Sequence, residues 1–181
     1  MPAASFKTDL LGAIPSLRAF AVSLSQNADK ADDLVQETLM KAWDKQSSFQ
    51  MGTNLKAWLF TILRNEFYSQ MRKRGREVQD TDGAMTARLA IHPEQDGMLD
   101  LEDFRSALDQ LPPDQREAII LIGASGFSYE EAADICDCAV GTIKSRVSRA
   151  RTRLHEILGV DDDSEYGPDA ISTQVLGSNI P

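Results

Sequence analysis

The sequence is poor in the residues that build metal and redox sites. Its 181 residues include only two cysteines and two histidines. Cys136 and Cys138 are separated by one residue, which is too close for an ordinary structural disulfide, and two cysteines are too few for a structural zinc site. His92 and His155 lie far apart in the chain. We therefore expect no metal and no cofactor. The cysteines are expected to be small packing residues, with a redox role as the alternative.

Catalytic motifs and long apolar runs are also missing. The chain has no G-x-S-x-G, P-loop or zinc-hydrolase spacing, so we expect neither catalytic residues nor a small-molecule substrate. Its longest apolar run, Ala118 to Ile122, is far too short to span a bilayer. The segment Met1 to Leu11 lacks the apolar run of a signal peptide. These features predict a cytoplasmic protein that has no membrane partner and is not an enzyme.

Acidic residues outnumber basic ones, but they are concentrated in two segments. The chain has 28 Asp and Glu against 19 Lys and Arg, a net charge of −9. Residues 77–100 hold six acidic residues and one basic residue, and residues 160–181 hold five acidic residues and no basic residue. The rest of the chain is therefore close to neutral. For this reason the acidic total does not exclude a nucleic-acid partner.

The hydrophobic pattern follows the period of an α-helix, and strand-like alternation is nearly absent, which predicts an all-α protein. Between Lys30 and Asp44 one apolar stripe is expected to be buried: Ala31, Leu34, Val35, Thr38, Leu39, Ala42 and Trp43. An earlier helix is expected around Leu17 to Leu24, with Pro15 in its first turn. A third helix is expected from Leu55 to Arg74, after a loop over Gln46 to Asn54.

The helical pattern lapses over residues 77–100, where glycines, a proline and acidic residues occur without a period. We therefore predict two small helical domains, residues 8–76 and 101–158, joined by a flexible charged linker over residues 77–100. The acidic segment 159–181 is expected to be a disordered tail, because it has few apolar residues to bury.

The second domain carries the pattern of a helix-turn-helix. Pro112-Pro113 begins a helix whose apolar residues Ala118 to Ile122 are expected to be deeply buried. Ser128, followed three residues later by Glu131, is typical of a capping box at the start of a short helix. After a tight turn, the last helix is expected to run from Val140 to Leu158.

This last helix is expected to be apolar on one face and basic on the other. At about 100° per residue, the packed face holds Val140, Ile143, Val147, Ala150, Leu154 and Ile157. The outward face holds Lys144, Ser145, Ser148, Arg149 and Thr152. Between Gly141 and Arg153 there are five basic residues and no acidic residue, which favours binding in a DNA major groove. A merely solvated basic face is the alternative, but the capped short helix before it favours DNA binding.

The first domain also ends in a basic cluster mixed with aromatic residues. Its members are Arg64, Arg72, Lys73, Arg74 and Arg76, with Phe60, Phe67 and Tyr68. Such a mixture suits opened DNA, because cations hold the backbone while rings or pockets take unstacked bases. Phe60 and Phe67 have a simpler interpretation as core residues, since aromatics at helical spacing are usually buried.

Several strings resemble those of bacterial sigma factors of the extracytoplasmic-function (ECF) group. The helix-turn-helix in domain four of that group is similar to G-T-I-K-S-R-V-S-R-A-R (Gly141 to Arg151), preceded by F-S-Y-E-E-A-A (Phe127 to Ala133). Domain two is similar to D-D-L-V-Q-E-T-L-M-K-A-W (Asp32 to Trp43) and A-W-L-F-T-I-L-R-N (Ala57 to Asn65). The EcfG type, which directs the general stress response of alphaproteobacteria, is also similar in A-I-P-S-L-R-A-F-A, L-R-N-E-F-Y-S-Q, H-P-E-Q and L-I-G-A-S-G-F-S-Y.

This resemblance implies that the chain binds core RNA polymerase and opens a promoter. Domain two of the family docks on the clamp helices of the largest polymerase subunit, here through Asp33, Gln36, Glu37, Met40 and Lys41. Its loop captures a flipped base of the minus-ten element, here near Ser48, Phe49 and Gln50. The next helix contacts the same element, here through Asn65, Ser69, Arg72, Arg74 and Arg76.

The resemblance also implies upstream DNA recognition and control by an inhibitor. Domain four of the family reads the minus-thirty-five element, G-G-A-A-C in this type, here through Lys144, Ser145 and Arg149. Phosphate or secondary contacts would come from Thr142, Arg146 and Ser148. EcfG proteins are held inactive by a small anti-sigma protein, NepR, which a response regulator with a sigma-like domain removes. A NepR-type protein is thus the third expected partner, beside core polymerase and promoter DNA.

Two other functions remain open at this point. A sigma-like decoy would bind only the anti-sigma protein, but decoys of the stress pathway carry a receiver domain, for which this chain has neither the length nor the strand pattern. A helix-turn-helix repressor with a ligand-sensing first domain would explain the last helix but not the strings that resemble domain two.

Overall fold

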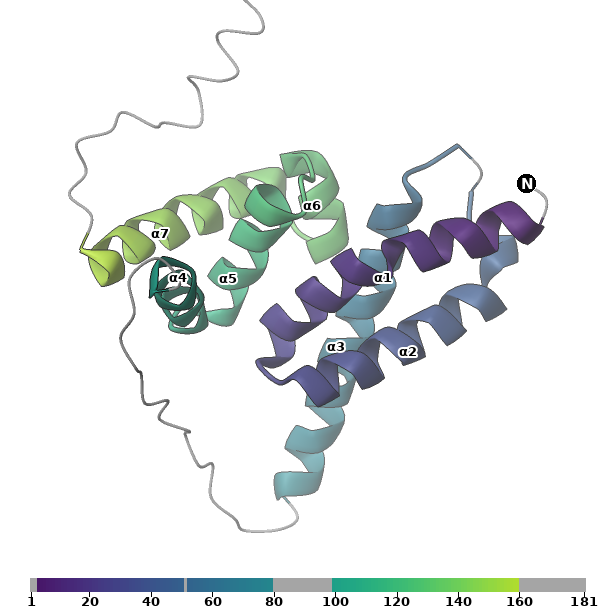
Figure 1. The fold of residues 1–181 in the computed structure, drawn as a ribbon, viewed down its shortest axis with the longest axis horizontal. Helices are drawn as coiled ribbons and strands as arrows, with labels where there is room; N and C mark the ends of the chain where they lie inside the picture. The colour runs from purple at the N-terminus through teal and green to yellow at the C-terminus, as the bar shows by residue number, and fades with distance from the viewer. Residues whose placement is uncertain (1–2, 51, 80–98, 160–181) are drawn as a thin grey trace, which may run out of the picture.

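A computed structural model of the chain describes residues 3–50, 52–79 and 99–159 (Figure 1). In these ranges every regular element is helical, as the hydrophobic pattern predicts. The first half contains α1 (Ala3–Ser25), α2 (Ala28–Asp44), the 3-10 turn η1 (Gln46–Ser48) and α3 (Leu55–Gln79). The second half contains α4 (Leu99–Asp109), α5 (Pro113–Ile119), the π-helical turn η2 (Ile120–Ala124), α6 (Tyr129–Cys136) and α7 (Val140–Leu158).

The predicted linker falls largely outside the described residues, and the predicted tail does so almost entirely. At its two ends the linker prediction is wrong, because α3 continues to Gln79 and α4 begins at Leu99. None of the helices in the described ranges combines the length and apolar character that a membrane crossing requires.

Helix α1 starts earlier than the sequence pattern indicates. Pro15 was expected in its first turn but lies inside the helix, which runs from Ala3 to Ser25. A proline has no backbone N–H to donate, so this position costs one intrahelical hydrogen bond. The turns before it are held by burial, since Phe6 is 6% exposed and Leu10 is 5% exposed. Tertiary packing therefore outweighs the local signal of the proline.

Helix α2 buries most of its predicted stripe. Its Asn27 cap accepts a hydrogen bond from the Lys30 N–H at 2.9 Å. Ala31, Leu34, Val35, Thr38 and Ala42 are buried as predicted. Leu39 is only half-buried, and the prediction for Trp43 is wrong because this residue is 43% exposed. The ring of Trp43 lies 6.4 Å from that of Phe6 in the first turns of α1.

The second half forms the predicted helix-turn-helix. Ser128 and Glu131 make both hydrogen bonds of the capping box at the start of α6. Asp137 ends α6 in the left-handed conformation, with φ of 51°, and α7 then spans Val140–Leu158 as predicted. The expectation of a uniformly buried run at Ala118 to Ile122 is wrong, because only Ala118 and Leu121 are buried.

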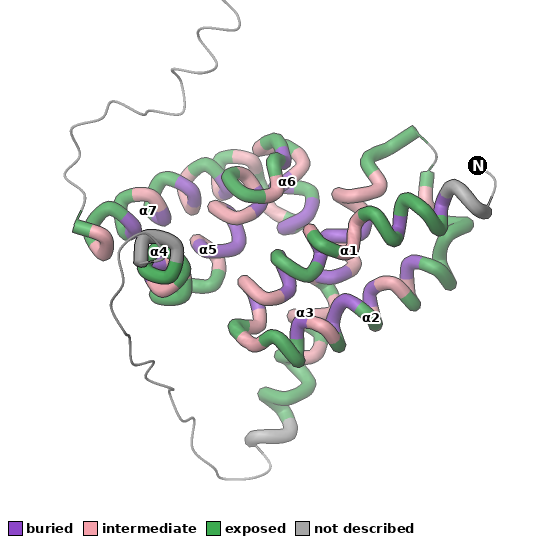
Figure 2. The backbone as a smooth tube through the Cα atoms, viewed as in Figure 1, coloured by how far each residue is buried: buried purple, intermediate pink, exposed green. Residues whose placement is uncertain are grey.

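The two halves pack directly against each other. One continuous core cluster contains buried residues of both, with Phe20 and Phe60 from the first half and Phe127 from the second. Phe60 stacks on Phe20 with ring centroids 4.8 Å apart and meets Phe127 edge-on at 4.9 Å. Figure 2 shows buried residues along the inner sides of α1, α3, α5, α6 and α7. Surfaces that lie between the halves are therefore covered in this arrangement.

Candidate nucleic-acid interface

Helix α7 presents a polar face opposite a fully packed one. Ile143, Val147, Ala150 and Leu154 are buried, while Val140 and Ile157 are half-buried. On the other side Lys144, Ser148 and Arg149 are exposed, and Ser145 and Thr142 are half-buried. The structure thus brings together the residues predicted to read the upstream element. Exposed hydroxyls and cations on one helical face fit a major groove.

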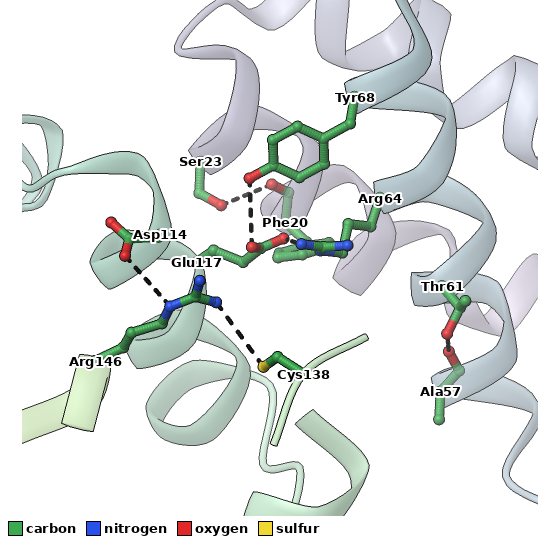
Figure 3. Close-up of polar contacts among 10 residues, drawn as sticks. All are labelled: Phe20, Ser23, Ala57, Thr61, Arg64, Tyr68, Asp114, Glu117, Cys138 and Arg146. Carbon is green, nitrogen blue, oxygen red and sulfur yellow. Dashed lines mark hydrogen bonds and ion pairs between the residues drawn. The ribbon is translucent and has the colours of Figure 1, made fainter. Parts of the chain in front are cut away.

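Arg146 is the exception among the predicted contacts of α7. Its Nε lies 3.3 Å from the Asp114 carboxylate of α5, and its Nη1 lies 4.0 Å from the Cys138 sulfur (Figure 3). The side chain is half-buried and joins the recognition helix to the turn before it. In this structure Arg146 therefore helps to position α7 through its pair with Asp114 of α5.

Helix α6 is capped at its start and contacts α7. Glu131 accepts a hydrogen bond from the Ser128 N–H at 2.9 Å and another from the Asn54 side chain at 2.7 Å. These bonds lower the pKa of Glu131, chiefly through the Ser128 N–H. Lys144 of α7 lies over the Tyr129 ring, with Nζ 5.7 Å from the centroid. Helix α6 thus contacts Lys144, which lies on the recognition face of α7.

The end of α3 forms a second basic surface. Arg72, Lys73, Arg74 and Arg76 are all exposed, and Figure 1 shows these last turns projecting past the other helices. Asn65 and Ser69 are also exposed. Spacings of four, three and four residues place Asn65, Ser69, Arg72 and Arg76 along one side of the helix. Arg74 points elsewhere on the same projecting segment. The predicted minus-ten contacts on α3, apart from Arg74, therefore share an accessible surface.

The loop before α3 differs from its prediction at one residue. Ser48 and Gln50 are exposed, but Phe49 is half-buried and packs against Phe6 at 6.3 Å and Trp58 at 5.3 Å. Phe49 is therefore a support of the loop in this structure, because its ring packs against the core. Beside the loop lies a cavity of about 960 Å³, which Phe49 and Lys56 help to line.

The predicted polymerase-binding residues lie along the outer side of α2. Asp33, Gln36 and Met40 are exposed, and Met40 reaches 64% exposure. Glu37 is half-buried and lies 3.4 Å from the Lys41 Nζ. Lys41 is not free, because it pairs with Glu66 of α3, and this hydrogen bond raises the pKa of Lys41.

An apolar patch continues from Met40 and was missed by sequence analysis. It consists of Met40, Trp43 at 43% exposure and Leu11 at 56% exposure. These side chains help to line a groove of about 530 Å³ between α1 and α2. The signal that could have found it was the large aromatic residue at the end of α2, which was instead assigned to the core.

A buried polar cluster between the halves was also missed. The Arg64 Nε donates to Glu117 Oε1 at 2.7 Å, and the Tyr68 hydroxyl donates to Glu117 Oε2 at 3.4 Å (Figure 3). The Glu117 side chain is only 1% exposed. Burial, the larger cause, and the Glu117 charge together raise the pKa of Tyr68 to about 12. The available signal was a glutamate beside the apolar run of α5.

Among the described residues, no three His, Cys, Asp or Glu side chains gather closely enough to hold a metal ion. Both cysteines are free, Cys136 buried and Cys138 half-buried.

Comparisons with known proteins agree with this arrangement. Residues 13–77 match the family model "Sigma-70 region 2", and residues 101–154 match "Sigma-70, region 4". The ECF RNA polymerase sigma factor EcfG of Rhodopseudomonas palustris is 61% identical over 175 residues, which cover 97% of each chain. The ECF sigma factor SigM of Bacillus subtilis is 31% identical over 80% of this chain and 90% of its own.

A solved structure is similar over most of the fold. The sigma factor RpoE of Bartonella quintana, in a co-crystal with the anti-sigma factor NepR, superimposes with a TM-score of 0.78. The two proteins are 73% identical, and the match covers 87% of this chain and 98% of RpoE. With two sigma-70 regions in order and a relative that matches over nearly its whole length, this chain belongs to the ECF family of RNA polymerase sigma factors and is of the EcfG type.

Proposed function

We propose that this sigma factor binds core RNA polymerase through α2, reads promoter DNA through α7 and α3, and is restrained by a NepR-type anti-sigma protein. One observation supports the assignment of a separate binding role to each of these three helices. The exposed residues of α2 and α7 form two polar surfaces opposite buried residues of the same helices, and the projecting, fully exposed end of α3 forms a third.

The upstream element would be read by α7. Lys144 and Arg149 are exposed and can reach guanine acceptors in the major groove, while Ser145, Ser148 and Thr142 can bond phosphates or base edges. Arg149 is the strongest candidate for a base contact, since it is exposed near the middle of the helix. Arg146 would contribute through the position that its pair with Asp114 gives α7.

The minus-ten element would be held by α3 and its preceding loop. Arg72, Arg74 and Arg76 supply charge for the phosphates, and Asn65 and Ser69 supply hydrogen bonds. Ser48 and Gln50 stand exposed beside the cavity that Phe49 helps to form. A single unstacked base can be accommodated in such a space while cations hold its backbone.

Core polymerase would bind the exposed side of α2. Asp33, Gln36 and Glu37 offer polar contacts, and Met40 offers an apolar anchor that continues into Trp43. A partly apolar surface with a polar rim is typical of protein interfaces. Lys41 would support this surface through its pair with Glu66.

Control by a NepR-type protein is supported by the similarity to RpoE, which was crystallised with NepR. A role in the general stress response is supported by the resemblance to the EcfG type. A decoy remains the alternative for the anti-sigma contact alone, and a repressor for DNA binding alone. Neither a decoy nor a repressor would use the exposed surface at Met40 to bind polymerase.

Binding to purified core polymerase separates these functions. Wild-type protein should form a stoichiometric holoenzyme. Met40→Asp should weaken binding at least tenfold, whereas Asp29→Ala, a change at an exposed position near the other end of α2, should not. A NepR-type protein should compete with core polymerase. Failure of the wild-type chain to bind core polymerase at all would leave only the decoy or the repressor.

A further inference from the structure

The polar cluster between the halves lies on the same helix as the predicted minus-ten contacts. Arg64 and Tyr68 are one turn apart on α3, directly beside Asn65 and Ser69. The Arg64 guanidinium lies over the Tyr68 ring, with 4.7 Å from its central carbon to the ring centroid. A cation stacked on an aromatic ring is a combination that binds the backbone and an unstacked base of single-stranded DNA.

We propose that Arg64 and Tyr68 belong to the surface that holds the opened minus-ten strand, and that Glu117 of α5 covers them while the two halves are packed together. The proposal rests on the proposed promoter function and deepens it. It assigns DNA-contacting roles to two residues that are covered here, and an intramolecular competitor role to a third.

Glu117 meets Arg64 and Tyr68 as an oxyanion of DNA would. One carboxylate oxygen accepts from the Arg64 Nε at 2.7 Å, and the other accepts from the Tyr68 hydroxyl at 3.4 Å (Figure 3). Carboxylate and phosphate oxygens bind a guanidinium through the same charge-assisted hydrogen bonds. Glu117 therefore takes the place on Arg64 that a phosphate would take, and both cannot bind there at once.

The packing of the halves has an apolar basis that does not depend on this charge pair. Phe60 and Phe127 meet at 4.9 Å, and Phe20 stacks on the other side of Phe60. A buried ion pair is seldom more stabilising than an apolar pair of the same size, because both charges lose their hydration. Stability alone thus gives little reason to place a carboxylate that is 1% exposed between two helices.

Separation of the halves would break the contacts of Glu117 with Arg64 and Tyr68. Glu117 would regain water, and Arg64 and Tyr68 would become accessible on α3. Arg64 precedes Arg72 by eight residues, a rise of about 12 Å along the helix. The newly exposed pair would fill the stretch of α3 between the loop at Ser48 and the basic end at Arg72.

Three variants of the full chain test the proposal. Arg64→Ala removes the cation, Glu117→Gln removes the competing charge, and Gln26→Asn is the control. Gln26 also donates across the halves, from Nε2 to the Asp109 carbonyl at 3.0 Å, and it lies outside the proposed DNA-binding surfaces, so shortening it removes one such contact. Two readouts are needed. One is energy transfer between fluorophores on exposed positions of α2 and α4, and the other is the rate of open-complex formation by holoenzyme on duplex promoter DNA.

The expected signature is a pair of opposite effects. Arg64→Ala and Glu117→Gln should both lower the fraction of closed protein. Only Arg64→Ala should slow promoter opening, by about tenfold for the loss of one stacking or phosphate contact. Glu117→Gln should match or exceed the wild-type rate, and Gln26→Asn should stay within about twofold of it. Arg64→Lys, which keeps the charge, should recover most of the rate.

Other results overturn the proposal. If Arg64→Ala holoenzyme opens promoters as fast as wild type, Arg64 is only a contact between the halves. If Glu117→Gln slows opening as much as Arg64→Ala, Glu117 is not a competitor. Circular dichroism spectra establish that each variant is folded, and Arg64→Gln, which also lacks the charge and should slow opening likewise, replaces Arg64→Ala should that variant not fold. A wild-type holoenzyme that starts no transcript would instead contradict the proposed function itself.

Discussion

The ring of Phe60 in α3 meets the ring of Phe127, just before α6, edge-on with centroids 4.9 Å apart. This contact joins the region 2 half to the region 4 half at the centre of one core. Phe60 is fully buried and Phe127 is 5% exposed, and the Lys56 Nζ lies 5.1 Å from the Phe127 centroid. An aromatic pair of this kind contributes both buried area and a favourable ring geometry.

Replacing Phe127 with alanine should therefore destabilise the packed arrangement. We expect Phe127→Ala to lower the free energy of unfolding by about 3 kcal/mol, as for other large-to-small changes at buried aromatic positions. Phe104→Ala is the control, because Phe104 is 42% exposed, and should change this free energy by less than about 0.5 kcal/mol. Urea denaturation followed by circular dichroism measures both. Equal midpoints for the two variants would contradict the role of Phe127 in the core.

The capping box predicts a pH-dependent contribution to stability. The Ser128 N–H and the Asn54 side chain hold the pKa of Glu131 below its usual value. A carboxyl whose folded pKa is depressed stabilises the protein above its unfolded pKa, and this contribution is lost as the pH falls through the folded pKa. Glu131→Gln should thus be less stable than wild type at neutral pH, and the difference should shrink in acid.

The measurement is the free energy of unfolding of both proteins from neutral pH to about pH 3. Glu130→Gln removes the same charge at the neighbouring exposed position and corrects for the change in net charge. If the difference in the free energy of unfolding between Glu131→Gln and wild type grew as the pH fell, a stabilising Glu131 carboxylate in the capping box would be contradicted.

The two cysteines should differ sharply in reactivity. Burial raises the pKa of the Cys136 thiol to about 12, so very little of the reactive thiolate forms at neutral pH. Cys138 is half-buried in the turn beside Arg146. We expect a thiol reagent to modify one cysteine in the native protein and the second only on unfolding. Cys138→Ser should abolish the fast reaction, and rapid modification of Cys136 in that variant would contradict its packing role.

Arg149 should carry sequence discrimination at the upstream element. Arg149→Ala is expected to weaken binding of the cognate element by about 1–3 kcal/mol and to reduce the preference over a mutated element. Arg153→Ala is the control, since Arg153 is also exposed but pairs with Glu156 at 3.0 Å. Holoenzyme binding to both DNA sequences at one fixed salt concentration measures the effect. A variant that kept full affinity and unchanged preference would remove Arg149 from the recognition surface.

The helix-turn-helix could be predicted from sequence because its signals are local. The capping box needs only Ser128 and Glu131, and the packed face of α7 follows from the helical period of Ile143 and its successors. The bounds of α7 agree with the prediction for the same reason. The residues of the basic face follow from the same geometry, since positions opposite a buried stripe must face outward.

The contacts between the halves could not be predicted because they depend on long-range packing. Nothing near Glu117 in the chain indicates that Arg64, 53 positions earlier, will neutralise it. The start of α1 before Pro15 likewise depends on the burial of Phe6. The exposure of Trp43 depends on how much of α2 is covered by the neighbouring helix α1. Lys41 looked free on α2 because its partner Glu66 lies on another helix.

The most direct test of the promoter function is run-off transcription with core polymerase and this chain. The template carries a G-G-A-A-C upstream element, and the control template has that element scrambled. We predict one transcript with a defined start on the first template only, which disappears when a NepR-type protein is added before core polymerase. Core polymerase that gives the same transcripts with and without this chain would contradict the central claim.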